Sequence, residues 1–98
     1  MYNIRYTELA EADLSELFHI IYEDKPMFAI EYIDKFDKFI ALLEENPFMG
    51  IECKHKKIDK NCRVLVYDNY LIFYTVKQEE IVIIRILNAH NDYNDRIH

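Results

Sequence analysis

The pattern of apolar side chains changes at Gly50, the single glycine of the chain. Before this residue, apolar positions recur every three or four residues, which is the period of an amphipathic helix. After it, they alternate or run continuously, as they do in β-strands. Helices that precede a run of strands predict an α+β fold, and the 98 residues suit one domain spanning residues 1–98.

The part before Gly50 predicts one strand and two helices. Residues 2–6 alternate apolar and polar side chains, which indicates a half-buried strand. Helical spacing follows over residues 8–23, with Thr7 as the expected N-cap, and again over residues 27–45. Pro26 separates the two because it disfavours helix just before it and suits a helix start. We expect an antiparallel helical hairpin that packs on one face of the sheet.

The part after Gly50 predicts four strands. The order of elements is therefore β-α-α-β-β-β-β, with a mainly antiparallel sheet. Asp68-Asn69 is a two-residue hairpin turn, and the first of the four segments is a polar edge strand guarded by lysines. The expected strands cover residues 54–58, 62–67, 70–76 and 81–87.

Two of these strands are apolar on both faces. A sheet covered on one side alternates apolar with polar residues. In residues 70–74 and 81–84, by contrast, the side chains are apolar at both odd and even positions, which face opposite sides of the sheet. We expect the free protein to expose an apolar surface on residues 70–76 and 81–87, and a partner chain to cover it.

The net charge of −6 is unevenly distributed. Residues 1–52 hold 12 acidic and 4 basic side chains, whereas residues 53–98 hold 6 acidic and 8 basic ones. Five of the basic residues fall between Lys54 and Arg63. An acidic half and a mildly basic half indicate either two surfaces with different partners or an ordinary solvated distribution of charge.

The chain lacks the patterns of several site classes. Cys53 and Cys62 are too few for a zinc site, and no spacing of ligands indicates a metal. One glycine cannot build a phosphate-binding loop, so we expect no cofactor. No secretory signal and no apolar run of membrane length is visible, so we expect a cytoplasmic protein with reduced thiols. A disulfide between neighbouring strands is the lesser alternative.

Several short motifs, in order, resemble the RelE/ParE family of bacterial toxins and look closer to its ParE-like branch. They are Ala12-Asp13-Leu14, Pro26, Asn46-Pro47-Phe48-Met49-Gly50, Arg63, Tyr70-x-Ile72-Phe73-Tyr74, and the segment from Arg85 to Tyr93. The resemblance implies the toxin of a type II toxin–antitoxin module with a compact ribonuclease-like fold. It also implies an antitoxin that wraps the toxin.

Departures from the family pattern bear on the mechanism. Members that cut mRNA on the ribosome use cationic side chains on the sheet, where this chain has Leu65, Leu71 and Phe73. Asn88 and Asn91 stand where the resemblance expects His and Arg, and an amide cannot shuttle a proton at neutral pH. The resemblance therefore favours a growth inhibitor that binds its target, DNA gyrase. A charge of −6 also suits a protein target better than ribosomal RNA.

Two alternatives remain open: a metal-independent, ribosome-dependent mRNA endoribonuclease (mRNA interferase), and a degenerate toxin that acts only with its antitoxin in operon repression. The expected partners are a cognate antitoxin and either DNA gyrase or the ribosome with its mRNA, with no membrane and no DNA binding except through the antitoxin. Arg85 also has a structural interpretation, as a buried pair with a helix acid. The target-binding candidates are Lys54, Lys56, Arg63, Asn88, Asn91 and Tyr93, and the nuclease candidates are Arg63, Arg85, His90 and Tyr93.

Overall fold

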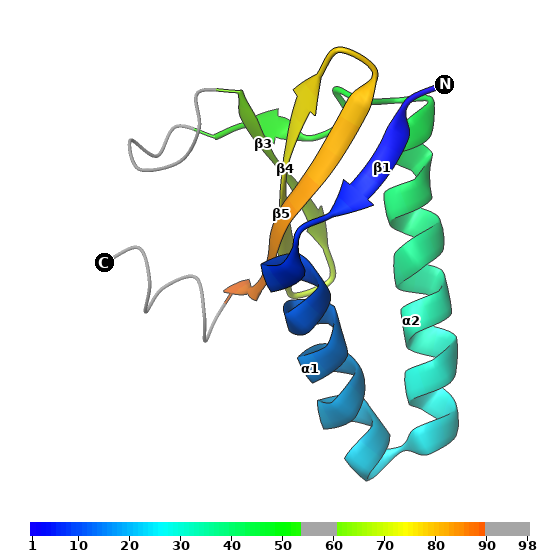
Figure 1. Cartoon of the computed structure of the whole chain (residues 1–98). Coiled ribbons are helices and arrows are strands. Elements are labelled where there is room, and N and C mark those ends of the chain that lie inside the picture. Colours follow the sequence, from blue (N-terminus) through cyan, green and yellow to red (C-terminus); the bar gives the residue numbers. More distant parts are fainter. Residues whose placement is uncertain (54–60, 90–98) are drawn as a thin grey trace.

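The computed structural model describes residues 1–53 and 61–89, which form a helical hairpin packed on one face of a sheet (Figure 1). Within this part of the chain the predicted α+β class and the order β-α-α-β-β-β-β are confirmed. The helices are α1 (Glu8–Asp24) and α2 (Pro26–Ala41), followed by the 3₁₀ turn η1 (Leu42–Glu44). The strands are β1 (Asn3–Tyr6), β2 (Ile51–Glu52), β3 (Cys62–Tyr67), β4 (Tyr70–Lys77) and β5 (Glu80–Asn88).

The helix boundaries follow local chemistry. The Thr7 side chain accepts a hydrogen bond from the Ala10 amide at 3.0 Å, which confirms the predicted N-cap. Pro26 is the first residue of α2, one residue before the predicted start at residue 27. The prediction of helix to residue 45 is wrong by one turn, which tightens into η1. In this turn the Glu45 amide donates to the Leu42 carbonyl, three residues earlier, at 3.3 Å, and the backbone and side-chain nitrogens of Asn46 donate to the same carbonyl at 3.1 Å.

The strand order across the sheet is β1-β5-β4-β3-β2. The three pairs among β2, β3, β4 and β5 are antiparallel, so the sheet is mainly antiparallel as predicted. β1 and β5 are parallel, from Asn3 opposite Glu80 to Tyr6 opposite Ile83. The first and last described strands of the chain are therefore neighbours in space (Figure 1).

The two hairpin turns that lie within the described residues each contain a residue with positive φ. Asp68 has φ 55° and lies in the predicted two-residue turn, where Tyr67 pairs with Tyr70. Gln78 has φ 54° in the turn between β4 and β5. This second turn holds two residues, because the ladder extends beyond the predicted strand ranges 70–76 and 81–87 and pairs Lys77 with Glu80.

A β-bulge interrupts β5 at Ile84. Tyr74 pairs with Ile83 and Phe73 with Arg85, so Ile84 has no partner on β4. Two hydrogen bonds join the bulge to the start of α1. The Thr7 amide donates to the Ile83 carbonyl at 3.0 Å, and the Thr7 hydroxyl donates to the Ile84 carbonyl at 2.8 Å. The extra residue shifts the alternation, so that Ile86 packs in the same core as Ile83.

Apolar side chains fill both faces of the sheet. The main core lies between the sheet and the helices and includes Leu17, Phe36, Ile40, Leu43, Leu65, Ile72, Tyr74, Ile81, Ile83 and Ile86. On the second face Phe73 and Leu87 are 6% and 7% exposed, with Cys62, Val64 and Leu71 packed against them. The expectation of an open apolar surface on this face is wrong at these two residues. Leu71 and Ile84 remain half-buried.

The expectation of reduced thiols is also wrong, because Cys53 and Cys62 form a disulfide. The pairing of Glu52 with Arg63 in the β2–β3 ladder continues by one residue. It places Cys53 opposite Cys62, with the Cys53 amide donating to the Cys62 carbonyl at 3.0 Å and the Cα atoms 5.3 Å apart. The edge strand expected over residues 54–58 lies outside the described residues.

Candidate functional site

Arg85 on β5 pairs with Asp13 on α1, 72 residues earlier. The Arg85 Nε and Nη2 atoms donate to the two carboxylate oxygens of Asp13 at 2.8 and 2.9 Å. The Ile86 amide donates to the same carboxylate at 2.9 Å. The side chains are 22% and 13% exposed, so each charge is tolerated because the other neutralises it. The structural interpretation of Arg85 as a partner of a helix acid is confirmed.

Arg63 on β3 holds the turn that runs from Asn46 to Gly50. Its Nη1 atom donates to the carbonyls of Gly50 at 2.6 Å and Phe48 at 3.4 Å. The guanidinium also lies 4.9 Å from the centre of the Phe48 ring. Arg63 therefore has a structural role. It also lines a hollow of about 130 Å³, and a contact with a target stays a prediction.

Tyr74 on β4 forms hydrogen bonds with the same turn. Its hydroxyl donates to the Pro47 carbonyl at 3.0 Å and accepts from the Gly50 amide at 2.8 Å. The pKa of the Tyr74 hydroxyl is raised above its usual value. Burial is the largest cause, and it outweighs the hydrogen bond from Gly50 and the charge of Arg63, which lower the pKa. A Cβ at Gly50 would lie 2.7 Å from the Val64 carbonyl oxygen and 2.8 Å from the Tyr74 hydroxyl. Only glycine fits this approach of the turn to the sheet.

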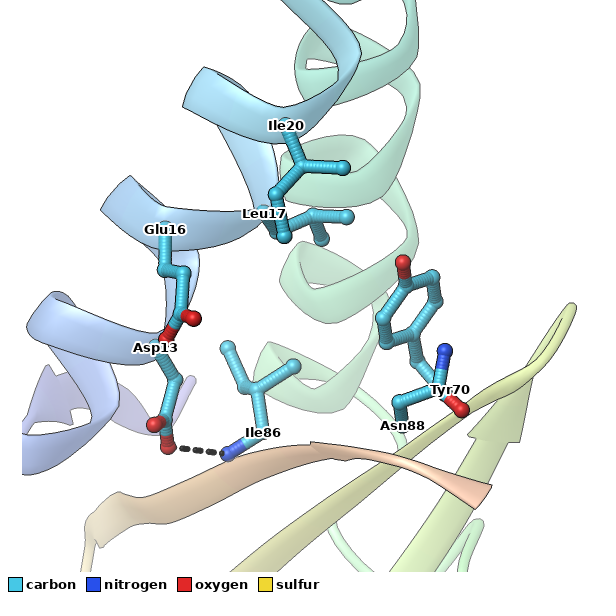
Figure 2. A pocket seen from close by; sticks show the side chains of 7 residues that line it. All are labelled: Asp13, Glu16, Leu17, Ile20, Tyr70, Ile86 and Asn88. Carbon is cyan, nitrogen blue, oxygen red and sulfur yellow. Dashed lines mark hydrogen bonds between the residues drawn. The ribbon is translucent and has the colours of Figure 1, made fainter. Parts of the chain in front are cut away.

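A hollow of about 210 Å³ lies between α1 and the ends of β4 and β5 (Figure 2). Its lining is Asp13, Glu16, Leu17, Ile20, Tyr70, Ile86 and Asn88. Figure 2 shows Leu17 and Ile20 on the helix side, with Tyr70 and Asn88 across from them. The hollow combines apolar walls with carboxylate and amide groups at its edge, an arrangement that suits a side chain with an apolar stem and a polar end.

The two acids of this hollow differ in their surroundings. Asp13 is neutralised by Arg85. Glu16 is exposed, and no hydrogen bond or ion pair joins its side chain to another residue within 1–53 and 61–89. The negative charge that the hollow presents to a partner is therefore that of Glu16.

The structure brings together some of the predicted site residues. Asn88, at the end of β5, lies in the same hollow as Asp13, the partner of Arg85. Arg63 lies apart from them on the turn. Five predicted residues fall outside the described part of the chain: Lys54, Lys56, His90, Asn91 and Tyr93.

Sequence reasoning assigned no role to Asp13, Glu16 or Tyr74. Asp13 was detectable, because it stands three residues after Ala10 and four before Leu17, on the apolar face of its helix. An acid on that face needs a buried partner. Tyr74 had no distinguishing pattern, since its role depends on how closely the turn approaches β4.

Within the described residues, no group of three or more His, Cys, Asp or Glu side chains is placed to hold a metal ion. Neither helix of this part of the chain has the length and hydropathy that crossing a bilayer requires.

Two of the solved structures that share this fold come from P. aeruginosa and Helicobacter pylori. The structure described as the chromosomal ParDE TA system from P. aeruginosa matches with a TM-score of 0.77 at 20% identity, covering 92% of this chain and 98% of that one. The solution structure of a conserved hypothetical protein, HP0894, from Helicobacter pylori matches with a TM-score of 0.58 at 18% identity, covering 95% and 99%. No curated protein sequence matches the chain.

The family assignment comes from the sequence as a whole. Residues 4–93 match the family model for the ParE toxin of the type II toxin–antitoxin system, parDE. This stretch spans the helices, every strand from Ile4 onward and the hollow beside Glu16. The chain therefore belongs to the ParE toxin family of type II toxin–antitoxin systems.

Proposed function

We propose that the protein inhibits growth by binding DNA gyrase, and that a cognate antitoxin neutralises it. Membership of the ParE toxin family supports a toxin. The observation that carries binding over RNA cleavage is the engagement of both candidate arginines. Arg85 is bound to Asp13, and Arg63 to the carbonyls of the Asn46–Gly50 turn.

RNA cleavage requires side chains that the described part of the sheet does not offer where cleaving relatives carry them. A nuclease of this kind needs cations that contact the phosphate and groups that move protons. Where cleaving relatives carry sheet cations, Leu65 and Phe73 are buried and Leu71 is half-buried. A protein that acts by binding needs no such cluster.

The target is tested by two assays run on one preparation. We expect the purified protein to inhibit supercoiling by DNA gyrase and to leave translated mRNA intact in primer extension. His90→Gln is the matched variant, because the loss of a general acid or base lowers a cleavage rate by about 10²–10⁴-fold. Cleavage by the wild type that is lost in His90→Gln would show the protein to be an mRNA endoribonuclease and refute the proposal.

The antitoxin is tested with the protein encoded by the adjacent reading frame. At a hundredfold excess over its dissociation constant, we expect it to stabilise the toxin by about 2.7 kcal/mol. It should also restore supercoiling. Unchanged melting and unchanged inhibition would contradict neutralisation by this partner. Binding by a wild-type protein that inhibits neither gyrase nor growth would identify a degenerate toxin.

A further inference from the structure

The hollow beside α1 is too small for an ordinary small-molecule site. Its volume of about 210 Å³ lies below the roughly 300–1,000 Å³ of typical ligand pockets. One side chain of a protein partner is an occupant of suitable size. Leu17, Ile20 and Ile86 offer that side chain apolar contact along its length, and Ile20 is 61% exposed.

The negative charge of the hollow favours a cationic side chain from the partner. Glu16 leaves one carboxylate at the edge of the hollow, while Asp13 is neutralised by Arg85. The same helix carries further acids at Glu8, Glu11, Glu23 and Asp24, and residues 1–52 sum to −8. A second copy of this chain that docked through the same helix would bring the same acidic side chains and be repelled. A cationic partner segment is attracted.

We infer that the hollow receives a Lys or Arg side chain from an amphipathic segment of the antitoxin. This inference rests on the proposed function, because it supplies the chemistry of the partner named there. The aliphatic stem lies along Leu17, Ile20 and Ile86, and the cation reaches the carboxylate of Glu16. Glu16 then helps to determine which antitoxin the toxin accepts, since a neutral or acidic side chain leaves it unpaired.

The test compares charge reversal at two positions of α1. The affinity of the protein encoded by the adjacent reading frame is measured for the wild type, Glu16→Lys and Glu11→Lys. Both acids are exposed, but five residues place them about 140° apart around the helix. We expect Glu16→Lys to weaken binding about tenfold or more, because two cations then face each other. Glu11→Lys makes the same change of charge on α1 but away from the hollow, so it should weaken binding clearly less than Glu16→Lys does; equal losses in the two variants would overturn the inference.

A salt series supplies a second readout. We expect the affinity of the wild type to fall more steeply with ionic strength than that of Glu16→Gln, because that variant lacks the charge. Equal affinities and equal salt slopes in the wild type and the Glu16 variants overturn the inference but leave the antitoxin proposal intact. Failure of the wild type to bind overturns the antitoxin proposal and this inference together.

Discussion

The pair of Asp13 and Arg85 joins the first helix to the last described strand through one carboxylate. Asp13 accepts two hydrogen bonds from the guanidinium and one from the Ile86 amide. Removal of one partner of a buried pair leaves the other charge without compensation, which costs far more than the intact pair contributes.

We expect Asp13→Ala to lower the free energy of unfolding by about 3–5 kcal/mol, because Arg85 and the Ile86 amide lose their acceptor. Urea unfolding followed by circular dichroism measures this loss. The control is Glu16→Ala, one turn further along α1 and exposed, which should change stability by no more than about 0.5 kcal/mol. Equal midpoints for the two variants would rule out a stabilising role for Asp13.

Tyr6 titrates differently in the folded and the unfolded chain. Burial and the neighbouring Asp37 carboxylate raise the pKa of Tyr6 from 10.0 to about 12. The folded state therefore favours the neutral phenol. The stability that follows from this preference is complete below pH 10 and is lost as the pH rises through 12.

We expect the wild type to lose stability between pH 10 and 12 more steeply than Tyr6→Phe, which has no phenol to ionise. Thermal melts of both proteins at half-unit steps of pH measure the difference. Parallel curves over this range would show that the Tyr6 pKa is the same in the folded and unfolded states.

Among the elements, the turn between β4 and β5 is strained at one residue. Gln78 has φ 54°, a left-handed conformation that costs an L-residue roughly 1–2 kcal/mol. Glycine adopts it without this cost, although it loses more entropy on folding.

We therefore expect Gln78→Gly to raise the free energy of unfolding by about 0.5–1 kcal/mol. Glu79→Gly is the matched control, because Glu79 is not among the residues with positive φ. There glycine should destabilise by about 0.5–1 kcal/mol. The two changes should have opposite signs in chemical unfolding, and a loss of stability in both would contradict this account.

The disulfide between Cys53 and Cys62 closes a short loop, with a sequence separation of 9, between β2 and β3. A loop of this length restricts the unfolded chain by about 2–3 kcal/mol. We expect reduction by dithiothreitol to lower the melting temperature by about 10 °C or more. Cys53→Ser should melt at the lower temperature with or without the reductant. A wild type that melts unchanged after complete reduction would exclude this contribution.

At the scale of the whole molecule, the sequence predicted the class and order of elements well. Both helices and the hairpin at Asp68 follow from local periodicity and turn chemistry, which are visible within a few residues. The position of β1 was not predictable, because its partner Glu80 lies far along the chain. The bulge at Ile84 was missed for a similar reason. It depends on Thr7, which contacts it across the fold.

The candidate site was less predictable than the fold. Residue types indicated that Arg63 and Arg85 need partners, but not whether each partner is a target or the protein itself. The distinction depends on three-dimensional neighbours: the Gly50 carbonyl for Arg63 and Asp13 for Arg85. The hollow beside Glu16 also arises only where α1 meets the ends of β4 and β5.

β1 is an edge strand of the sheet, and its removal would expose β5. β1 covers β5, where Ile81 and Ile83 are fully buried. Deletion of residues 1–6 would leave this strand with unpaired backbone groups at an open edge. We expect light scattering to detect larger assemblies of the truncated protein than of the wild type, whereas deletion of Met1 alone should leave the mass unchanged. A folded truncated protein with the same number of chains per particle as the wild type would show that β1 is dispensable.

The contact between the two ends of the fold also has a consequence during synthesis. The Thr7 hydroxyl and its acceptor, the Ile84 carbonyl, are 77 residues apart. At about 5–20 residues per second, a ribosome needs about 4–15 s to connect them. Until then β1 lacks its neighbouring strand, and Asp13 lacks Arg85. A nascent chain released before β5 is made cannot complete the sheet, so premature termination of translation yields no folded toxin.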